Sequence, residues 1–389
     1  MAIVKTLKKQ GYRTGMYGKN HLFTYERLEE VWDELDEICL GNCDDYEKYE
    51  HSFSSFMVAD DDAHNITGRL TDETIDFIKR QTGPFLAWVN YQDPHPAFAC
   101  PKKYYEMFST EKVKLPESYK NHDPGKEPRR DELWRLHSEM DLCSEEDMKK
   151  AIATYMGQVR YVDDMVGKLM ATLKETGRDK DTIVLFFADH GELLGNHGMT
   201  HKLPAFYDCL TRIPVILHHP EGTGAGMIFR GLVEEVDLVP TLLDFMDVPI
   251  PHTMVGKSVA SEIRAGADKG KETILCEAGI AAPLPKKPIE GMKLKAPFAP
   301  TSFGCGAMIR KGEYKLSIYS DDRCELYNRE EDPEEIHNLY GRDEYKEIQQ
   351  ELTLELLKRV LSVKVRDIGR IDWDDEEYPI DVRANPLEA

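Results

Sequence analysis

The chain has 389 residues, of which 41% are hydrophobic, so it can form a large core and is not a mostly disordered protein. Its 71 acidic residues outnumber its 50 basic residues, and the net charge of −21 argues against nucleic acids and anionic membrane surfaces as partners. No apolar run reaches the roughly 18 residues that a membrane-spanning helix needs, so no membrane span is predicted.

Helices and strands are predicted to alternate along the first two thirds of the chain. Apolar residues at helical spacing predict helices over residues 2–10, 71–80, 145–175 and 236–246. Strand-like or continuously apolar runs predict strands over residues 12–18, 84–91, 182–188 and 213–219. Residues 24–70 are acidic, aromatic and irregular, and are predicted to be a long surface excursion. Residues 110–147 are highly charged with little periodicity, and are predicted to be an insertion or lid. The alternation predicts an α/β fold with a doubly wound, mainly parallel sheet.

The pattern changes after about residue 265. Residues 306–320 and 324–328 are typical of short antiparallel strands, and residues 343–361 of a long helix. We therefore expect an α/β catalytic domain over residues 1–265, a smaller α+β subdomain over 266–370, and an acidic tail over 371–389.

The eight cysteines form no CxxC pair, which fits isolated thiols better than a disulfide framework. The residues after Met1 lack the apolar stretch of a signal peptide. Together these features favour a reducing compartment, and hence the cytoplasm. The sequence leaves the oligomeric state open.

The first chemical motif is FADHGELLGNHGMTHK, which follows the strand predicted at residues 182–188. Ligands gather at the carboxyl ends of strands in open α/β sheets, so Asp189 and His190 are placed where a divalent cation could bind. The alternative is an Asp-His-Gly turn with a capping role. His197, His201 and Lys202 follow within the same loop, and such a cluster is unusual for a simple turn.

The second motif is GKNHLF, which follows the strand at residues 12–18. If this stretch stays extended, Lys19 and His21 share one face and could grip a tetrahedral oxyanion together. The alternative is a solvated lysine beside a surface histidine.

The third motif is NYQDPHPAF, after the strand at residues 84–91. Two prolines fix the backbone around His95, which would hold its imidazole in place for hydrogen bonding or for proton transfer to a leaving group. The alternative is a proline-rich turn with an incidental histidine.

Together, GYRTGMYGKNHLF, DPHPAF and ADHGELLGNHG resemble the sulfatase family of the alkaline phosphatase superfamily in order and spacing, and the resemblance covers nearly the whole chain. It implies an alkaline phosphatase-like fold and a metal-assisted sulfuric ester hydrolase. By this resemblance, Asp189 and His190 are metal ligands, and Lys19 and Lys202 bind the sulfate group.

The resemblance also assigns catalytic positions to two histidines. His21 would lie beside the nucleophile, and His95 would contact the sulfate and the leaving oxygen. His197 and His201 match no assigned position and are kept as candidate pocket residues. The family implies calcium as the cation, but an imidazole ligand is unusual for calcium and keeps manganese and zinc open.

Two expected parts of a sulfatase site are not visible in this sequence. The family nucleophile is a formylglycine made within a C/S-x-P-x-R motif, and no Cys or Ser here begins that motif. An Asp-Asp pair should precede the GKNH motif, whereas the pairs at 44–45, 60–61 and 163–164 all follow it. We therefore expect a chain truncated before the formylglycine motif and inactive by itself.

Three hypotheses follow. The first is a sulfatase that acts on a sulfate monoester of a small molecule or a glycan. The second is a phosphonate monoester or phosphodiester hydrolase of the same superfamily. The third is a catalytically dead binding remnant, which the absent nucleophile supports.

Overall fold

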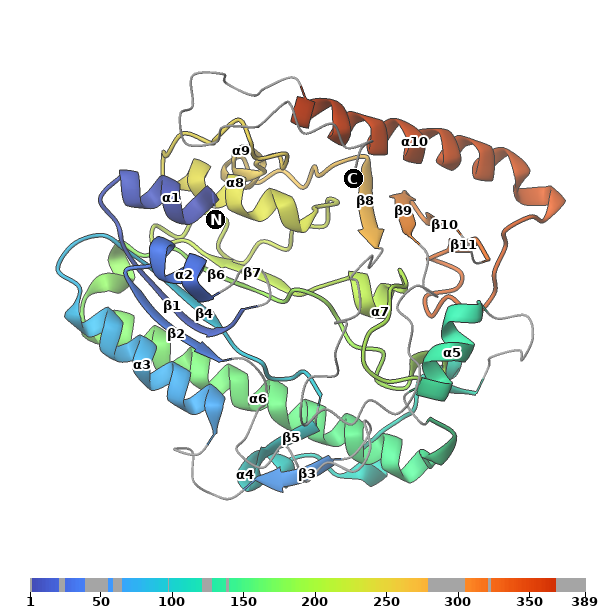
Figure 1. The fold of residues 1–389 in the computed structure, drawn as a ribbon, viewed down its shortest axis with the longest axis horizontal. Coiled ribbons are helices and arrows are strands. Elements are labelled where there is room, and N and C mark those ends of the chain that lie inside the picture. The colour runs from blue at the N-terminus through green and yellow to red at the C-terminus, as the bar shows by residue number, and fades with distance from the viewer. Residues whose placement is uncertain are drawn as a thin grey trace.

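A computed structural model of the chain describes residues 2–20, 25–38, 55–58, 65–96, 98–120, 128–137, 140–278, 305–320 and 323–368. Figure 1 shows a layered α/β body, labelled α1 to α9 and β1 to β7, beside a smaller sheet that is covered by the long helix α10. No described helix is long and apolar enough to cross a membrane.

The larger sheet is built around three parallel strands. Strand β1 (Arg13–Lys19) is central and pairs in parallel with β2 (Glu34–Ile38) and β4 (Phe85–Asn90). This confirms the predicted parallel sheet. Strand β2 was missed because its sequence, ELDEI, is acidic and lies in a segment predicted to be irregular.

Helices cover both faces of this sheet, as a doubly wound fold requires. Phe85 and Ala87 of β4 pack with α3 (Ile66–Arg80) and α6 (Glu145–Glu175). Leu86, which points to the opposite face, packs instead in a cluster with α1 (Ala2–Lys9) and α8 (Leu238–Phe245). The alternation along β4 follows the two-residue period of a strand.

Strand β6 (Val184–Phe187) forms a separate pair with β7 (Val215–His218), and the pairing is antiparallel. The strand predicted at 213–219 is thus present, and its antiparallel pairing is an exception within the mainly parallel fold. All residues of β4 and β6 are only half-buried, although their apolar runs predict complete burial. The physical reason is that each of these strands pairs on one side only among the described strands.

Caps explain two helix boundaries. Helix α3 begins five residues before the predicted start because the Asn65 side chain accepts a hydrogen bond from the backbone of Thr67. Helix α6 begins as predicted, at a capping box formed by Ser144 and Asp147.

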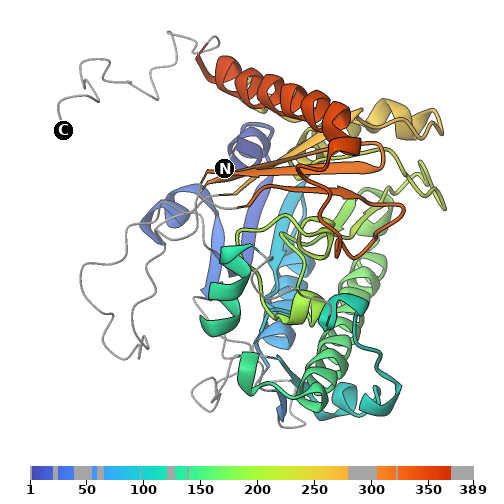
Figure 2. The same ribbon diagram turned by 90° about the vertical axis from the view of Figure 1, so that its right-hand side faces the viewer.

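The C-terminal sheet has four antiparallel strands in the order β11-β10-β9-β8. These are β8 (Thr273–Ala278), β9 (Gly306–Lys311), β10 (Tyr314–Tyr319) and β11 (Glu325–Asn328). Helix α10 (Lys346–Ile368) packs on one face through Leu352 and Leu356. Figure 2 shows this helix lying along the edge of the body.

The remaining elements are short. Helix α5 lies within residues 110–147, the predicted insertion or lid, whose charged sequence shows little periodicity. These elements are α2 (Tyr25–Val31), α4 (Lys102–Tyr105), α5 (Arg129–His137), α7 (Asp208–Thr211), α9 (Ala260–Arg264) and the parallel strands β3 (Ser55–Val58) and β5 (Phe98–Pro101).

Candidate active site

The carboxyl ends of β1, β4 and β6 meet at one edge of the fold. Lys19 is the last residue of β1, and Asn90, the last residue of β4, donates its side-chain N–H to the Lys19 carbonyl at 2.5 Å. Gly18 permits this approach, because a Cβ there would lie 2.1 Å from the Asn90 carbonyl oxygen. Asp189 follows β6, and its charge acts on the Lys19 ammonium.

Asp93 anchors the loop that carries His95. The Asp93 carboxylate is buried and accepts hydrogen bonds from Thr67 Oγ1 at 2.7 Å and Gln158 Nε2 at 2.8 Å. Burial raises the pKa of Asp93 to about 6. Asp93 thus ties this loop to α3 and α6, and so places His95.

The His95 imidazole is neutral at pH 7. Its Nδ1–H donates to the Pro96 carbonyl, which leaves Nε2 with a lone pair. Burial lowers the pKa of His95 to about 4, and the nearby Lys19 ammonium adds to the effect. A bound anion would counter the lysine charge and favour the protonated imidazole.

His190, Asp189 and Lys202 form a second group at the same edge. His190 Nδ1–H donates to the Gly191 carbonyl at 2.7 Å, so its Nε2 accepts from the Lys202 ammonium. The same Nε2 lies 3.6 Å from Asp189 Oδ1. The rings of His190 and His95 are 6.2 Å apart, which joins the two groups into one site.

Lys19 and Lys202 give this acidic protein a local positive site. The pKa values of both ammonium groups are lowered, in each case first by burial, and the charge of Lys202 lowers the pKa of Lys19 further. Two ammonium groups that repel each other this way favour a shared anion between them.

The loop over residues 190–202 is fixed by side chains that the motif analysis did not select. The Glu192 carboxylate accepts the backbone N–H groups of Leu194, at 3.2 Å, and of His201. Burial raises the pKa of Glu192 to about 7. From α5, Trp134 donates to the Thr200 carbonyl at 2.8 Å, and Arg135 to the His197 carbonyl at 2.6 Å. In the sequence, the sign of this supporting role was the acidic residue Glu192, which ends the DHGE motif.

The structure gathers most, but not all, of the predicted residues. Lys19, His95, Asp189, His190 and Lys202 lie together, and the ring of His201 contacts that of His95. The ring of His197 is buried and stacks on Tyr207, with centroids 3.9 Å apart. His21 lies outside the described residues.

The described residues supply only part of a metal site. Asp189 and His190 can give two ligands, but no group of three or more His, Cys, Asp or Glu side chains in the described ranges is placed to hold a metal ion. Calcium usually takes six or more ligands and zinc about four, so these two residues do not complete a site for either.

The Asp-Asp pair at 163–164 makes its contacts on and beside α6. Arg160 of the same helix pairs with both carboxylates, and the Tyr104 hydroxyl donates to Asp164 at 3.0 Å. The pairs at 44–45 and 60–61 lie outside the described residues.

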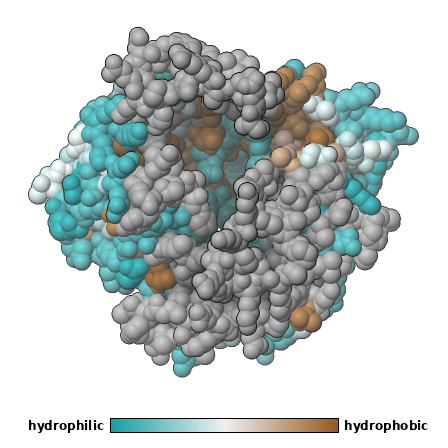
Figure 3. Space-filling model, viewed as in Figure 1, coloured by the Kyte–Doolittle hydropathy of each residue, from teal (hydrophilic) through white to brown (hydrophobic). Residues whose placement is uncertain are grey.

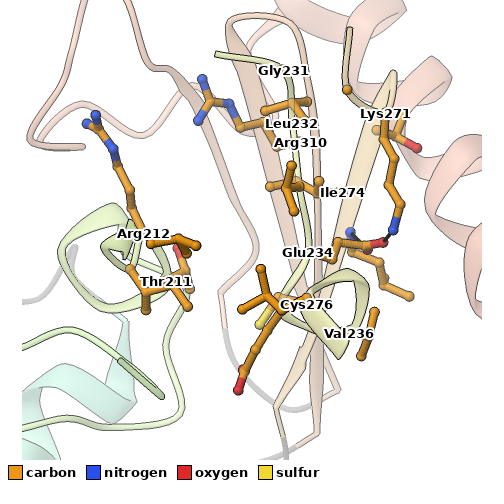
Figure 4. A pocket seen from close by; sticks show the side chains of 18 of the residues that line it. Thr211, Arg212, Gly231, Leu232, Glu234, Val236, Lys271, Ile274, Cys276 and Arg310 are labelled. Atoms are coloured by element: carbon orange, nitrogen blue, oxygen red, sulfur yellow. Dashed lines mark hydrogen bonds and ion pairs between the residues drawn. The ribbon is translucent and has the colours of Figure 1, made fainter. Parts of the chain in front are cut away.

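A cavity of about 1890 Å³ begins at Asp189, His190 and Lys202 and continues between β7 and the C-terminal sheet. Figure 3 shows a hollow on this face with hydrophobic residues inside it. Ile216 of β7 lines the cavity and is 63% exposed. Figure 4 shows Arg212 and Arg310 reaching into this space, while Lys271 is paired with Glu234.

Comparison with known proteins identifies two family regions. The family model described as "Sulfatase" matches residues 1–248, and the one described as "N-sulphoglucosamine sulphohydrolase, C-terminal" matches residues 304–361. The solved structure of phosphonate monoester hydrolase SpPMH from Silicibacter pomeroyi superposes with a TM-score of 0.73 at 22% identity, covering 92% of this chain and 79% of that one. BT4656, solved with D-glucosamine-2-N,6-O-disulfate as its substrate, gives 0.70 at 20% identity, covering 94% and 82%. These likenesses confirm the alkaline phosphatase-like fold.

Two relatives show the extent of the sequence match. An arylsulfatase of Clostridium perfringens is 26% identical over 327 residues, covering 81% of this chain and 61% of the relative. An N-acetylglucosamine-6-O-sulfatase of Bacteroides thetaiotaomicron is 24% identical over 415 residues, covering 90% and 70%. The chain thus spans about three fifths of the arylsulfatase. Because the family match covers more than half of its residues, the chain belongs to the sulfatase family.

Proposed function

We propose that the whole protein hydrolyses a sulfate monoester of a small molecule or a glycan. The observation that carries this proposal is the convergence of Lys19, Lys202 and neutral His95 at the strand ends. Two ammonium groups suit the oxygens of a sulfate, and the relatives named arylsulfatase and N-acetylglucosamine-6-O-sulfatase act on such esters by name.

The residues of this chain would divide the work as follows. Lys19 and Lys202 bind the sulfate oxygens and stabilise the negative charge that develops on them. The bound anion favours protonation of His95, whose Nε2 can then deliver a proton to the leaving alcohol oxygen as the sulfur–oxygen bond breaks. In this proposal His21 would lie beside the nucleophile.

Two components of the proposal come from family membership and not from the described residues. Asp189 and His190 would hold a divalent cation, calcium first and manganese or zinc as alternatives, with further ligands from elsewhere. When bound, the cation would neutralise charge on the sulfate. The nucleophile would be a formylglycine, and these 389 residues contain no C/S-x-P-x-R motif from which to make it. By itself this chain would therefore bind without turnover.

Binding tests the anion site directly. Titration of the chain with inorganic sulfate, measured by calorimetry with and without calcium, should show binding that Lys19→Ala and Lys202→Ala each weaken by about tenfold, the scale of one charge-assisted contact. Lys103→Ala is the matched control, since Lys103 is exposed and pairs with Asp164 of α6. Equal weakening by all three variants would contradict a specific site.

Measurements of substrate turnover and of protein mass can distinguish the sulfatase, the phosphonate or phosphodiester hydrolase and the binding remnant. Protein isolated from its source cells should hydrolyse an aryl sulfate faster than an aryl phosphodiester or phosphonate monoester, and the reverse order would favour the second hypothesis. A measured mass above the 44.6 kDa of this chain would support a longer active form. Sulfate binding at 44.6 kDa without turnover would support the binding remnant.

A further inference from the structure

His201 has an unusual backbone that is held on both sides. Its φ is +67°, in the left-handed region that side chains other than glycine seldom adopt. Its N–H donates to the Glu192 carboxylate, and its carbonyl accepts from the N–H of Leu193 at 3.1 Å. The fold therefore maintains an unfavourable conformation at this residue, which suggests that the direction of its side chain matters.

The ring of His201 packs against the rings of Phe98 and His95. It meets the ring of Phe98 edge-on, with centroids 6.3 Å apart. Phe98 is fully buried and packs in turn against Tyr155 at 6.3 Å. The His201 ring also meets that of His95, with centroids 6.4 Å apart and an interplanar angle of 61°. Both contacts have the edge-to-face geometry that aromatic pairs favour.

The His95 ring is held at several points. Its Nδ1–H donates to the Pro96 carbonyl. The ring of His190, 6.2 Å away, lies against His95 as well. With Nδ1 bonded and the ring packed against its neighbours, Nε2 keeps one direction.

We propose that His201 is a positioning residue for His95, and that its ring, braced by Phe98, aims His95 Nε2 at the sulfate group. This inference rests on the proposed function in assigning sulfate to His95. The role does not need the nitrogen atoms of His201, only its ring and its left-handed backbone. The motif comparison gave His201 no role.

The test uses the full chain with ¹⁵N-labelled histidine. His201→Gly and His201→Asn remove the ring while accepting the left-handed backbone, so Lys202 stays in place. His201→Phe restores a ring without nitrogens. The matched control is His197→Gly, because His197 also has a positive φ, 54°, in the same loop, but its ring stacks on Tyr207. The readouts are the His95 side-chain NMR signals and the affinity for inorganic sulfate.

In the glycine and asparagine variants we expect the His95 signals to broaden and the sulfate affinity to fall by about tenfold, since small misplacements of a binding group are costly. His201→Phe should restore both readouts to within about twofold, and His197→Gly should change neither. Unchanged His95 signals in both ringless variants would overturn the proposal. So would a phenylalanine variant as impaired as they are, which would assign the role to the imidazole nitrogens. If the unsubstituted chain bound no sulfate, the proposed function would fail, while the His95 signals would still decide the role of His201.

Discussion

The two sheets of this protein differ in how completely they are closed. In the C-terminal sheet, four strands pair without interruption, and Ile309, Leu316 and Leu326 are completely buried beneath α10. In the larger sheet, the parallel strands and the β6–β7 pair form separate hydrogen-bonded units, and β4 and β6 are half-exposed.

The interruption lies between two strands that run alongside each other. At one end, the Arg178 side chain before β6 donates to the Gly83 carbonyl before β4 at 3.0 Å. At the other end, the rings of His95 and His190 are 6.2 Å apart. Phe85 and Val184 also pack into one cluster. The sheet that carries the candidate site is thus the less closed one, and we expect it to be the less stable of the two sheets.

The largest expected effect comes from a buried ion pair in the closed sheet. Lys315 and Glu335 are 1% and 2% exposed, and the Lys315 ammonium also donates to the Phe206 carbonyl at 2.5 Å. Lys315→Met should lower the free energy of unfolding in urea by about 3 to 5 kcal/mol, because it leaves a buried carboxylate without this partner. Lys311→Met, in the exposed pair with Glu351, should cost below about 1 kcal/mol. Equal losses of unfolding free energy in the two variants would contradict this difference between the buried and the exposed ion pair.

The next largest effect should come from shortening core side chains, which should destabilise the protein more in the C-terminal sheet than in the larger sheet. Leu316→Ala removes a completely buried side chain from β10 and should cost about 4 kcal/mol of unfolding free energy. Leu86→Ala in half-buried β4 should cost about 2 kcal/mol, since part of that side chain already contacts water. Chemical denaturation of both variants measures the difference, and a larger loss for Leu86 would mean that the larger sheet is the better packed one.

The pH dependence of the unfolding free energy should show the titration of the buried His197. Burial lowers its pKa to about 4 from an ordinary value of 6.5, so the folded state binds its proton less readily than the unfolded state does. The resulting penalty is absent above pH 6.5 and grows as the pH falls towards 4, where it should approach about 3 kcal/mol. The difference in unfolding free energy between the wild type and His197→Asn, followed from pH 7.5 to 4, should change accordingly. A difference that stays constant with pH would exclude this titration.

The smallest expected effect is a difference in backbone amide hydrogen exchange between the two sheets, which can be measured for each residue. Backbone N–H groups of β9 and β10 pair within a continuous sheet, whereas those of β4 and β6 that point away from their single neighbours have no strand partner among the described residues. We expect these latter amides to exchange about 100-fold faster than those of β9, which corresponds to about 2.7 kcal/mol. Uniform protection across both sheets would show that β4 and β6 are paired in solution.

Much of the fold and several of the candidate site residues can be predicted from the sequence. Apolar periodicity sets α6, because its buried residues recur at helical spacing. The motifs around Lys19, His95 and Asp189 were expected at strand ends, and the structure brings them together there. Local spacing suffices for such features, since the strand direction fixes where each loop emerges.

Other features depend on residues far apart in the chain, and only the tertiary structure decided them. The antiparallel direction of β7 and the half-exposure of β4 follow from which strands become neighbours, which no local pattern records. The support that Glu192 gives to His201 depends on how the loop folds back on itself, and the bracing of His95 by His201 on contacts between separate segments. The sequence by itself determined which groups could do chemistry, while long-range packing decided which of them meet and how firmly each is held.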